Sequence, residues 1–232
     1  MYTLKLDFPG RNALSPTVLE HLEQGLDAAA GEPLLLCGTE QAFSAGLDLR
    51  HVLSLSLIEM HAFLVRVDRI AERLYEYSAP TAALVEGHAI AGGCVLAQCC
   101  DFRVASPSPK ARMGVSELAL GAAFPPRILK LMEQRLPPQS VALVVLGAEL
   151  YDMPGALAKG LLDEVTVDAA DKARAYLERV GSYPREAFAA SKSGLRKGRL
   201  TPSAADERRF AEQEVPMWKS PELIARVQAM LG

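Results

Sequence analysis

The sequence has little aromatic content, no large excess of either charge and no long apolar run. Aromatic residues make up 6% of the 232 residues, and the formal net charge is −3. This balance gives no electrostatic reason to expect a nucleic acid as partner. No apolar stretch approaches the length of a membrane span, so no membrane partner is expected. The first residues, MYTLKLDFPG, lack a signal-peptide core, and we expect a cytoplasmic protein.

Cysteines are also few, and their spacing matches no metal site. Cys37, Cys94, Cys99 and Cys100 all lie in apolar runs such as LLLCG and GGCVLAQCCDF. Adjacent cysteines make poor disulfide partners, and no zinc-binding pattern is present. We therefore predict buried free thiols in a reducing compartment, and no metal.

The first half of the chain alternates strand and helix patterns. Half of all residues are apolar, which is enough for one domain with a sizeable core. Ser15-Pro16 marks a helix start, and a longer helix is expected from about Ser56 to Tyr77. This alternation predicts an α/β architecture with layered sheets. The expected strands are Tyr2–Phe8 with period two, the apolar run Leu34–Cys37, Thr81–Val85 and Phe102–Val104.

The second half is predicted to be mostly helical. After Pro125-Pro126, helix-start pairs recur at Thr201-Pro202 and Ser220-Pro221, and Asp168 can cap another helix. One short strand is expected at Val165–Val167. We divide the chain into an α/β core, residues 1–167, and a C-terminal helical region, residues 168–232. Its amphipathic tail needs a partner surface.

Two glycine loops are placed where backbone amides can meet a ligand. They are Ala42–Arg50 and Glu86–Cys94, and each puts glycine between a predicted strand and a predicted helix. A helix N-terminus offers free N–H groups and the positive end of the helix dipole. Two such loops in one domain suggest two N–H donors directed at one oxygen, which is the arrangement of an oxyanion hole.

Five segments together resemble the enoyl-CoA hydratase/isomerase (crotonase) superfamily. FSAGLDLR resembles its first oxyanion loop and GHAIAGGCVLAQCCDFRVAS its second, while GRNALSPTVLEHL, MGVSELALG and LGAELYDMPGALAKGLLDEV resemble segments before and after them. The resemblance implies a crotonase-like (ClpP/crotonase) α/β fold of repeated ββα units with a C-terminal helical trimerisation region. A homotrimer or hexamer is therefore expected.

The resemblance also implies how the site works. The amides of Leu47 and Gly92 bind the thioester oxygen of an acyl-CoA substrate. Family hydratases use two glutamates, and the matching positions here are Val95 and Glu117. Water addition needs two acid/base groups, and a valine is neither. One glutamate is enough to move a proton from C2 to C4, so we expect isomerisation of 3-enoyl-CoA to 2-trans-enoyl-CoA with Glu117 as the single acid/base.

Coenzyme A enters as part of the substrate, and no separate cofactor is expected. By resemblance, Ala45 presents its backbone to the adenine, and Arg50 and Arg11 lie near the CoA phosphates. Asp48 belongs to the same cofactor-binding loop, and its carboxylate is expected to cap the next helix. Histidine 88 is interpreted as packing beside the second loop.

Other interpretations stay open at this point. The same oxyanion hole supports hydrolysis, decarboxylation or carbon–carbon cleavage of another acyl thioester, or the chain is a non-catalytic subunit that assembles with a related enzyme. A dienoyl-CoA isomerase would need a further acid where Ala122–Pro125 stands, so that branch is not expected. Phe124 and the prolines are expected to shape the acyl pocket. Met217 and Trp218 are expected to pack either against another subunit or in the acyl tunnel, with the subunit contact favoured.

Overall fold

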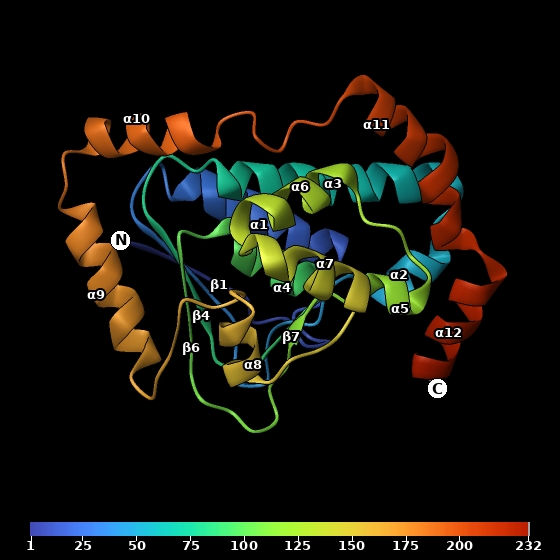
Figure 1. Ribbon diagram of the computed structural model, residues 1–232, viewed down its shortest axis with the longest axis horizontal. Coiled ribbons are helices and arrows are strands. Elements are labelled where there is room, and N and C mark those ends of the chain that lie inside the picture. Colours follow the sequence, from blue (N-terminus) through green and yellow to red (C-terminus); the bar gives the residue numbers. More distant parts are fainter. Residues whose placement is uncertain (232) are drawn as a thin grey trace.

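The strands form two parallel sheets in the computed structural model, which describes residues 1–231 (Figure 1). The larger sheet has the order β1-β2-β4-β6-β8 and the smaller sheet the order β3-β5-β7, with every neighbouring pair parallel. The strands are β1 (Tyr2–Lys5), β2 (Leu34–Cys37), β3 (Ala42–Ser44), β4 (Thr81–Val85), β5 (His88–Ile90), β6 (Phe102–Ala105), β7 (Met113–Gly114) and β8 (Glu164–Val165).

The chain repeats one unit three times, which confirms the predicted ββα architecture. In each unit one strand joins the larger sheet, the next joins the smaller sheet, and a helix follows. Parallel strands end at the same edge of a sheet, so the segments that follow β3, β5 and β7 start side by side. The helices of this half are α1 (Pro16–Ala28), α2 (Leu49–Ser54), α3 (Leu57–Tyr75), α4 (Gly92–Cys99) and α5 (Glu117–Leu120).

Local capping explains where these helices begin. The Ser15 side chain accepts from the Val18 amide at the start of α1, and Ser56 forms a capping box with Glu59 at the start of α3. Asp48 caps α2, as predicted. The apolar stripe of α3 is buried and consists of Met60, Phe63, Leu64, Val67, Ile70 and Leu74.

The second half is mostly helical, with corrections to its predicted boundaries. The helix expected at Thr201-Pro202 begins instead at Ala204, because Ser203 forms a capping box with Asp206. Asp168 occupies the N-cap position of α9, but its carboxylate accepts from the Thr166 hydroxyl and caps no amide. The elements are α6 (Pro126–Arg135), α7 (Pro138–Gly147), α8 (Met153–Ala158), α9 (Ala169–Gly181), α10 (Arg185–Arg196), α11 (Ala204–Arg209), a π-helical turn (Phe210–Glu214), a 3₁₀ turn (Val215–Lys219) and α12 (Pro221–Leu231).

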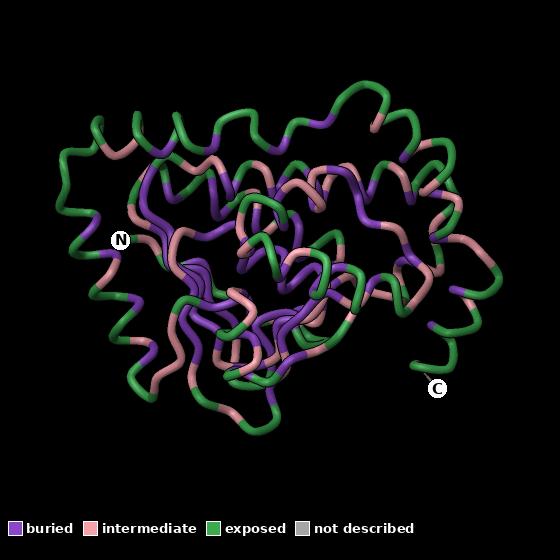
Figure 2. Tube along the Cα trace, viewed as in Figure 1, coloured by how far each residue is buried: buried purple, intermediate pink, exposed green. Residues whose placement is uncertain are grey.

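Both faces of the larger sheet are covered, which explains why every residue of its strands β2 and β4 is buried. The long helix α3 lies beside α1 and α4 on one side, and α9 packs across β2, β4 and β6 on the other (Figure 1). Figure 2 shows the strands as a buried centre with exposed residues along α9 and α10. The main core cluster also contains Phe210, Val215, Trp218, Leu223 and Val227, so the C-terminal helices share it with residues 1–167.

All four cysteines are buried free thiols, as predicted. Within residues 1–231, no helix has both the length and the apolar character that a membrane crossing requires.

Candidate active site

Three residues predicted from separate motifs line one cavity. Leu47 follows β3, Gly92 follows β5 and Glu117 follows β7, so the shared edge of the smaller sheet brings them together. The cavity volume is about 30 Å³. Its wall consists of Leu47, Leu64, Val67, Gly92, Val95, Glu117, Phe124, Pro125, Ile128 and Trp218.

The first loop is fixed by a bridge between Leu14 and Leu47. The Leu14 amide donates to the Gly46 carbonyl at 2.7 Å, and the Asp48 amide donates to the Leu14 carbonyl at 3.2 Å. In an extended segment the backbone N–H groups of neighbouring residues point to opposite sides. The N–H of Leu47 therefore points away from Leu14, and it donates to no acceptor in the described part of the protein.

The second loop touches the first through glycine backbone. A Cβ atom on Gly46 would lie 3.3 Å from the Gly92 nitrogen, and one on Gly92 would lie 2.8 Å from the Leu14 side chain. Gly92 is the first residue of α4, where the amide has no intrahelical acceptor. Ala91 before it has φ +50° and ψ −120°, a strained conformation for a residue with a Cβ. This turn places the free amide end of α4 beside Leu47.

Asn12 anchors the first loop, and sequence reasoning did not single it out. Its side-chain amide donates to the carbonyls of Leu6 and Ala42 at 3.0 and 2.9 Å, and its side-chain oxygen accepts from the Phe8 amide. Its own carbonyl accepts from the Ser44 hydroxyl, which in turn accepts from the Gly46 amide. The available signal was an Asn directly after Gly10-Arg11, because Asn tolerates the left-handed φ of 57° found here.

Glu117 is buried at the start of α5 without a charged partner. Glu117 is 8% exposed, and its Oε2 has no hydrogen-bond partner in the described structure. Burial raises the pKa of Glu117 to about 7, against a smaller opposing effect of the Ser116 and Glu117 amides. A carboxyl group with this pKa can both accept and return a proton near neutral pH.

The rest of the cavity wall is apolar. Val95, the position where a second glutamate would stand, is 3% exposed and faces the same cavity. Phe124 and Pro125 line it as predicted, whereas Pro126 does not. Trp218 also lines it, so the favoured expectation of packing on another subunit was wrong for Trp218, and the alternative placement in a cavity of its own chain is the one found. Its indole nitrogen donates to the Ala123 carbonyl at 3.0 Å. Met217 beside it is exposed.

The residues expected near CoA lie outside this cavity. The Ala45 amide donates to the Arg11 carbonyl at 3.0 Å, which leaves the Ala45 carbonyl as the backbone group for an adenine. Arg50 is exposed on α2, and Asp48 is engaged as its cap. Arg11 lines a separate cavity of about 320 Å³ together with Lys110 and His88.

His88 lines that separate cavity and is not among the residues that line the Glu117 cavity. Its Nδ1 accepts from the Arg112 amide at 3.2 Å, and burial together with Arg11 and Arg112 lowers its pKa. The interpretation of His88 as a packing residue agrees with this placement. Among residues 1–231, no three His, Cys, Asp or Glu side chains come together as a metal site would need.

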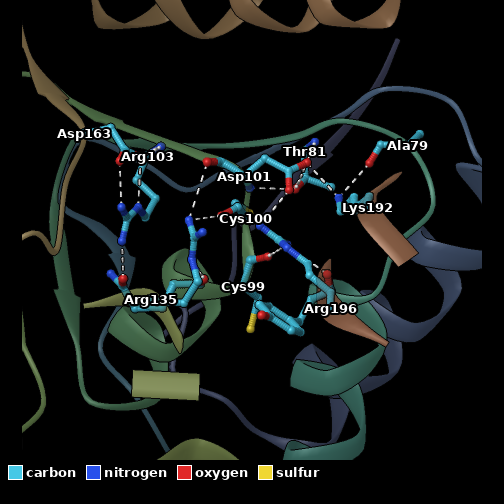
Figure 3. Close-up of polar contacts among 12 residues, drawn as sticks. Ala79, Thr81, Cys99, Cys100, Asp101, Arg103, Arg135, Asp163, Lys192 and Arg196 are labelled. Carbon is cyan, nitrogen blue, oxygen red and sulfur yellow. Dashed lines mark hydrogen bonds and ion pairs between the residues drawn. The ribbon is translucent and has the colours of Figure 1, made fainter. Parts of the chain in front are cut away.

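Two further groups of buried charges lie away from the cavity. Asp101 accepts from Thr81 and pairs with Lys192 and Arg196 of α10, each at 2.7 Å (Figure 3). A cavity of about 430 Å³ lies beside α3, α6 and α11, and Asp68 contributes to its wall. Burial raises the pKa of Asp68 to about 7, although Arg127 lies 3.8 Å away.

Comparison with known proteins agrees with this geometry. The model of the enoyl-CoA hydratase/isomerase family matches residues 1–221. The chain is 30% identical over 218 residues to the probable enoyl-CoA hydratase EchA17 of Mycolicibacterium paratuberculosis, covering 88% of this chain and 82% of that protein. It is 26% identical over 201 residues to mouse mitochondrial enoyl-CoA delta isomerase 1, covering 84% of this chain and 70% of that protein.

The crystal structure of human mitochondrial delta3-delta2-enoyl-CoA isomerase shares the fold. It superposes with a TM-score of 0.88 at 22% identity, covering 99% of this chain and 92% of that one. The fold and the site thus define an enzyme of the crotonase superfamily that acts on acyl-CoA. The chain belongs to the enoyl-CoA hydratase/isomerase family.

Proposed function

We propose that this enzyme isomerises 3-enoyl-CoA to 2-trans-enoyl-CoA, with Glu117 as the single acid/base. The observation that carries the proposal is the composition of the cavity wall. Glu117 is the one ionisable side chain among the described residues that line it, and Val95 takes the second carboxylate's place. The relatives carry both hydratase and isomerase names, so the acid/base set decides between the two reactions.

The proposed reaction moves one proton and needs no other reactant. The Glu117 carboxylate removes a proton from C2, and the C–H electron pair delocalises onto the thioester oxygen to give a dienolate. The amides of Leu47 and Gly92 donate to that oxygen, an effect worth about 3 kcal/mol per donor in related acyl chemistry. Protonated Glu117 then returns the proton to C4, and the double bond moves from C3–C4 to C2–C3.

Hydration is disfavoured because it needs two groups, one to activate water and one to hold the second proton. Hydrolysis, decarboxylation or cleavage of another acyl thioester would use the same two amides. A non-catalytic assembly subunit is the remaining alternative. The buried, unpartnered Oε2 of Glu117 argues against it, because such a group lowers stability and needs another reason to be retained.

In this proposal CoA lies outside the cavity. The Ala45 carbonyl meets the adenine, and Arg50 and Arg11 meet the phosphates beside the Asp48 cap. The homotrimer or hexamer and the cytoplasmic location stay predictions.

The test is conversion of 3-enoyl-CoA followed by the absorbance of the conjugated product. Wild type is expected to convert it and to hydrate crotonyl-CoA far more slowly. Glu117→Gln keeps the side-chain size but cannot take the proton, so turnover should fall by about 10³-fold or more while acyl-CoA binding by calorimetry persists. A Gln variant with wild-type turnover would show that Glu117 is not the base.

A further inference from the structure

Trp218 forms part of the wall of the cavity that Glu117 also lines. It is the largest side chain in the wall and is 3% exposed, although it lies on the short 3₁₀ turn Val215–Lys219 near the C-terminus. Its indole nitrogen donates to the Ala123 carbonyl at 3.0 Å. The segment that links α5 to α6 therefore holds the ring in place.

The remaining apolar walls have little freedom to move. Leu64 and Val67 of α3, Val95 of α4 and Ile128 of α6 all belong to the main core cluster. The volume of about 30 Å³ gives room for about two water-sized groups, whereas most small-molecule sites have about 300–1,000 Å³. Every additional methylene of an acyl chain must therefore displace part of the wall.

The turn that carries Trp218 is fixed by a second polar contact. Lys219 donates to the carbonyls of Leu53 and Val52 at the end of α2, at 3.1 and 3.4 Å. Together with the contact to Ala123, this holds the turn against α2 on one side and the end of α5 on the other. Moving the indole to admit a long chain would break hydrogen bonds and expose core surface.

We propose that Trp218 is the specificity-determining residue of this enzyme and restricts it to short acyl groups. The proposal rests on the proposed function, since it takes this cavity as the acyl site. The indole closes the space beyond the reacting carbons, and longer chains bind poorly because they meet it.

The first experiment uses Trp218 as its own probe, because it is the only tryptophan in the chain. Native enzyme is titrated with free CoA and with butyryl- and hexanoyl-CoA, none of which can isomerise. We expect no change in tryptophan emission with free CoA, and a shift with butyryl- and hexanoyl-CoA. Binding of the two short acyl-CoAs by calorimetry without any emission change would overturn the proposal.

The second experiment compares the turnover of 3-hexenoyl- and 3-dodecenoyl-CoA. Trp218→Ala should raise the ratio of kcat/KM for the long substrate to kcat/KM for the short one by about tenfold or more, and Trp218→Phe should raise it by less. The reason is that the fit of a single methylene in a pocket already changes discrimination between substrates by about tenfold or more. Met217→Ala is the matched control, since Met217 is the exposed neighbour on the same turn. Equal chain-length profiles in wild type and both Trp218 variants would refute the role of Trp218.

The two proposals can fail separately. If wild type converts no 3-enoyl-CoA but short acyl chains still shift the Trp218 emission, the reaction is wrong and the acyl site stands. If wild type isomerises long and short chains equally well, the reaction stands and the restriction by Trp218 is wrong.

Discussion

Glu117 is the residue whose protonation should control both activity and part of the stability. Burial raises its pKa to about 7, and only the carboxylate can remove a proton from C2. We expect kcat/KM for 3-enoyl-CoA to rise with pH and to level off above about 7, as measured in a pH–rate profile. Asp68→Asn is the control, since Asp68 has a similarly raised pKa but lines a different cavity.

The raised pKa of Glu117 also makes the stability of the protein depend on pH. The pKa of Glu117 is higher in the folded chain than the ordinary value of 4.5, so the folded state holds its proton more tightly. The stabilisation of the folded state by this tightly held proton is complete below pH 4.5 and is lost as the pH rises through about 7. Glu117→Gln should therefore be more stable than wild type at pH 8, by about 3 kcal/mol in urea unfolding. Equal stabilities at pH 8 would mean that the carboxylate is not desolvated.

Asn12 holds the first glycine loop, Ala42–Arg50, in place through its hydrogen bonds. Asn12→Gly keeps the left-handed backbone accessible and removes the side-chain hydrogen bonds to Leu6, Phe8 and Ala42. We expect a loss of about 2–4 kcal/mol in the free energy of unfolding and a fall in kcat of about tenfold or more with little change in KM. An unchanged kcat, measured where the variant is fully folded, would limit Asn12 to a structural role.

At the scale of elements, α10 is held to the core by buried charge rather than by apolar contacts. Lys192 and Arg196 of this helix pair with Asp101, and they also donate to the carbonyls of Ala79, Tyr75 and Cys99. Figure 3 shows these side chains converging on Asp101. Burial lowers the pKa of Lys192 to about 8, and Asp101 opposes this effect. The helix therefore depends on one carboxylate.

Removal of the Asp101 carboxylate should lower the stability of the protein. Asp101→Asn leaves two buried cations without a counter-charge, so we expect the free energy of unfolding to fall by about 3–5 kcal/mol in denaturant titrations. Asp171→Asn is the matched control: Asp171 pairs with Arg174 on the exposed face of α9, where a pair is worth about 0–1 kcal/mol. A loss as small as that of the control would show that Asp101 does not hold α10.

At the scale of the whole molecule, the C-terminal helices should unfold together with the sheets. Phe210, Trp218 and Leu223 belong to the same core cluster as β1, β2 and α3. The emission of Trp218 therefore reports on residues 168–232, whereas circular dichroism reports on the whole chain. We expect the two denaturation curves to coincide. A fluorescence transition at lower denaturant would show that the predicted division at residue 167 separates independent units.

Periodicity and capping signals in the sequence were sufficient for the α/β class, the approximate positions of the larger sheet's strands and most helix starts, whereas the ββα units came from the family resemblance. Periodicity and capping are local properties: Ser15 and Ser56 cap the next turn, and the apolar run Leu34–Cys37 fits a strand buried on both faces. The helix start predicted at Thr201-Pro202 was wrong, because Ser203 and Asp206 form a capping box and the helix begins after it. The prediction that Leu47, Gly92 and Glu117 form the active site came from the family resemblance.

Tertiary structure decided which distant side chains complete the cavity that Leu47, Gly92 and Glu117 line. Trp218 is about 100 residues from Glu117 in sequence, and no local pattern states that the two meet. The hydrogen bonds of Asn12 to residues 6, 42 and 43 and the ion pairs of Asp101 with α10 are likewise contacts between distant segments. The physical reason is that sequence periodicity determines which face of an element is apolar, whereas the packing of elements determines what that face meets.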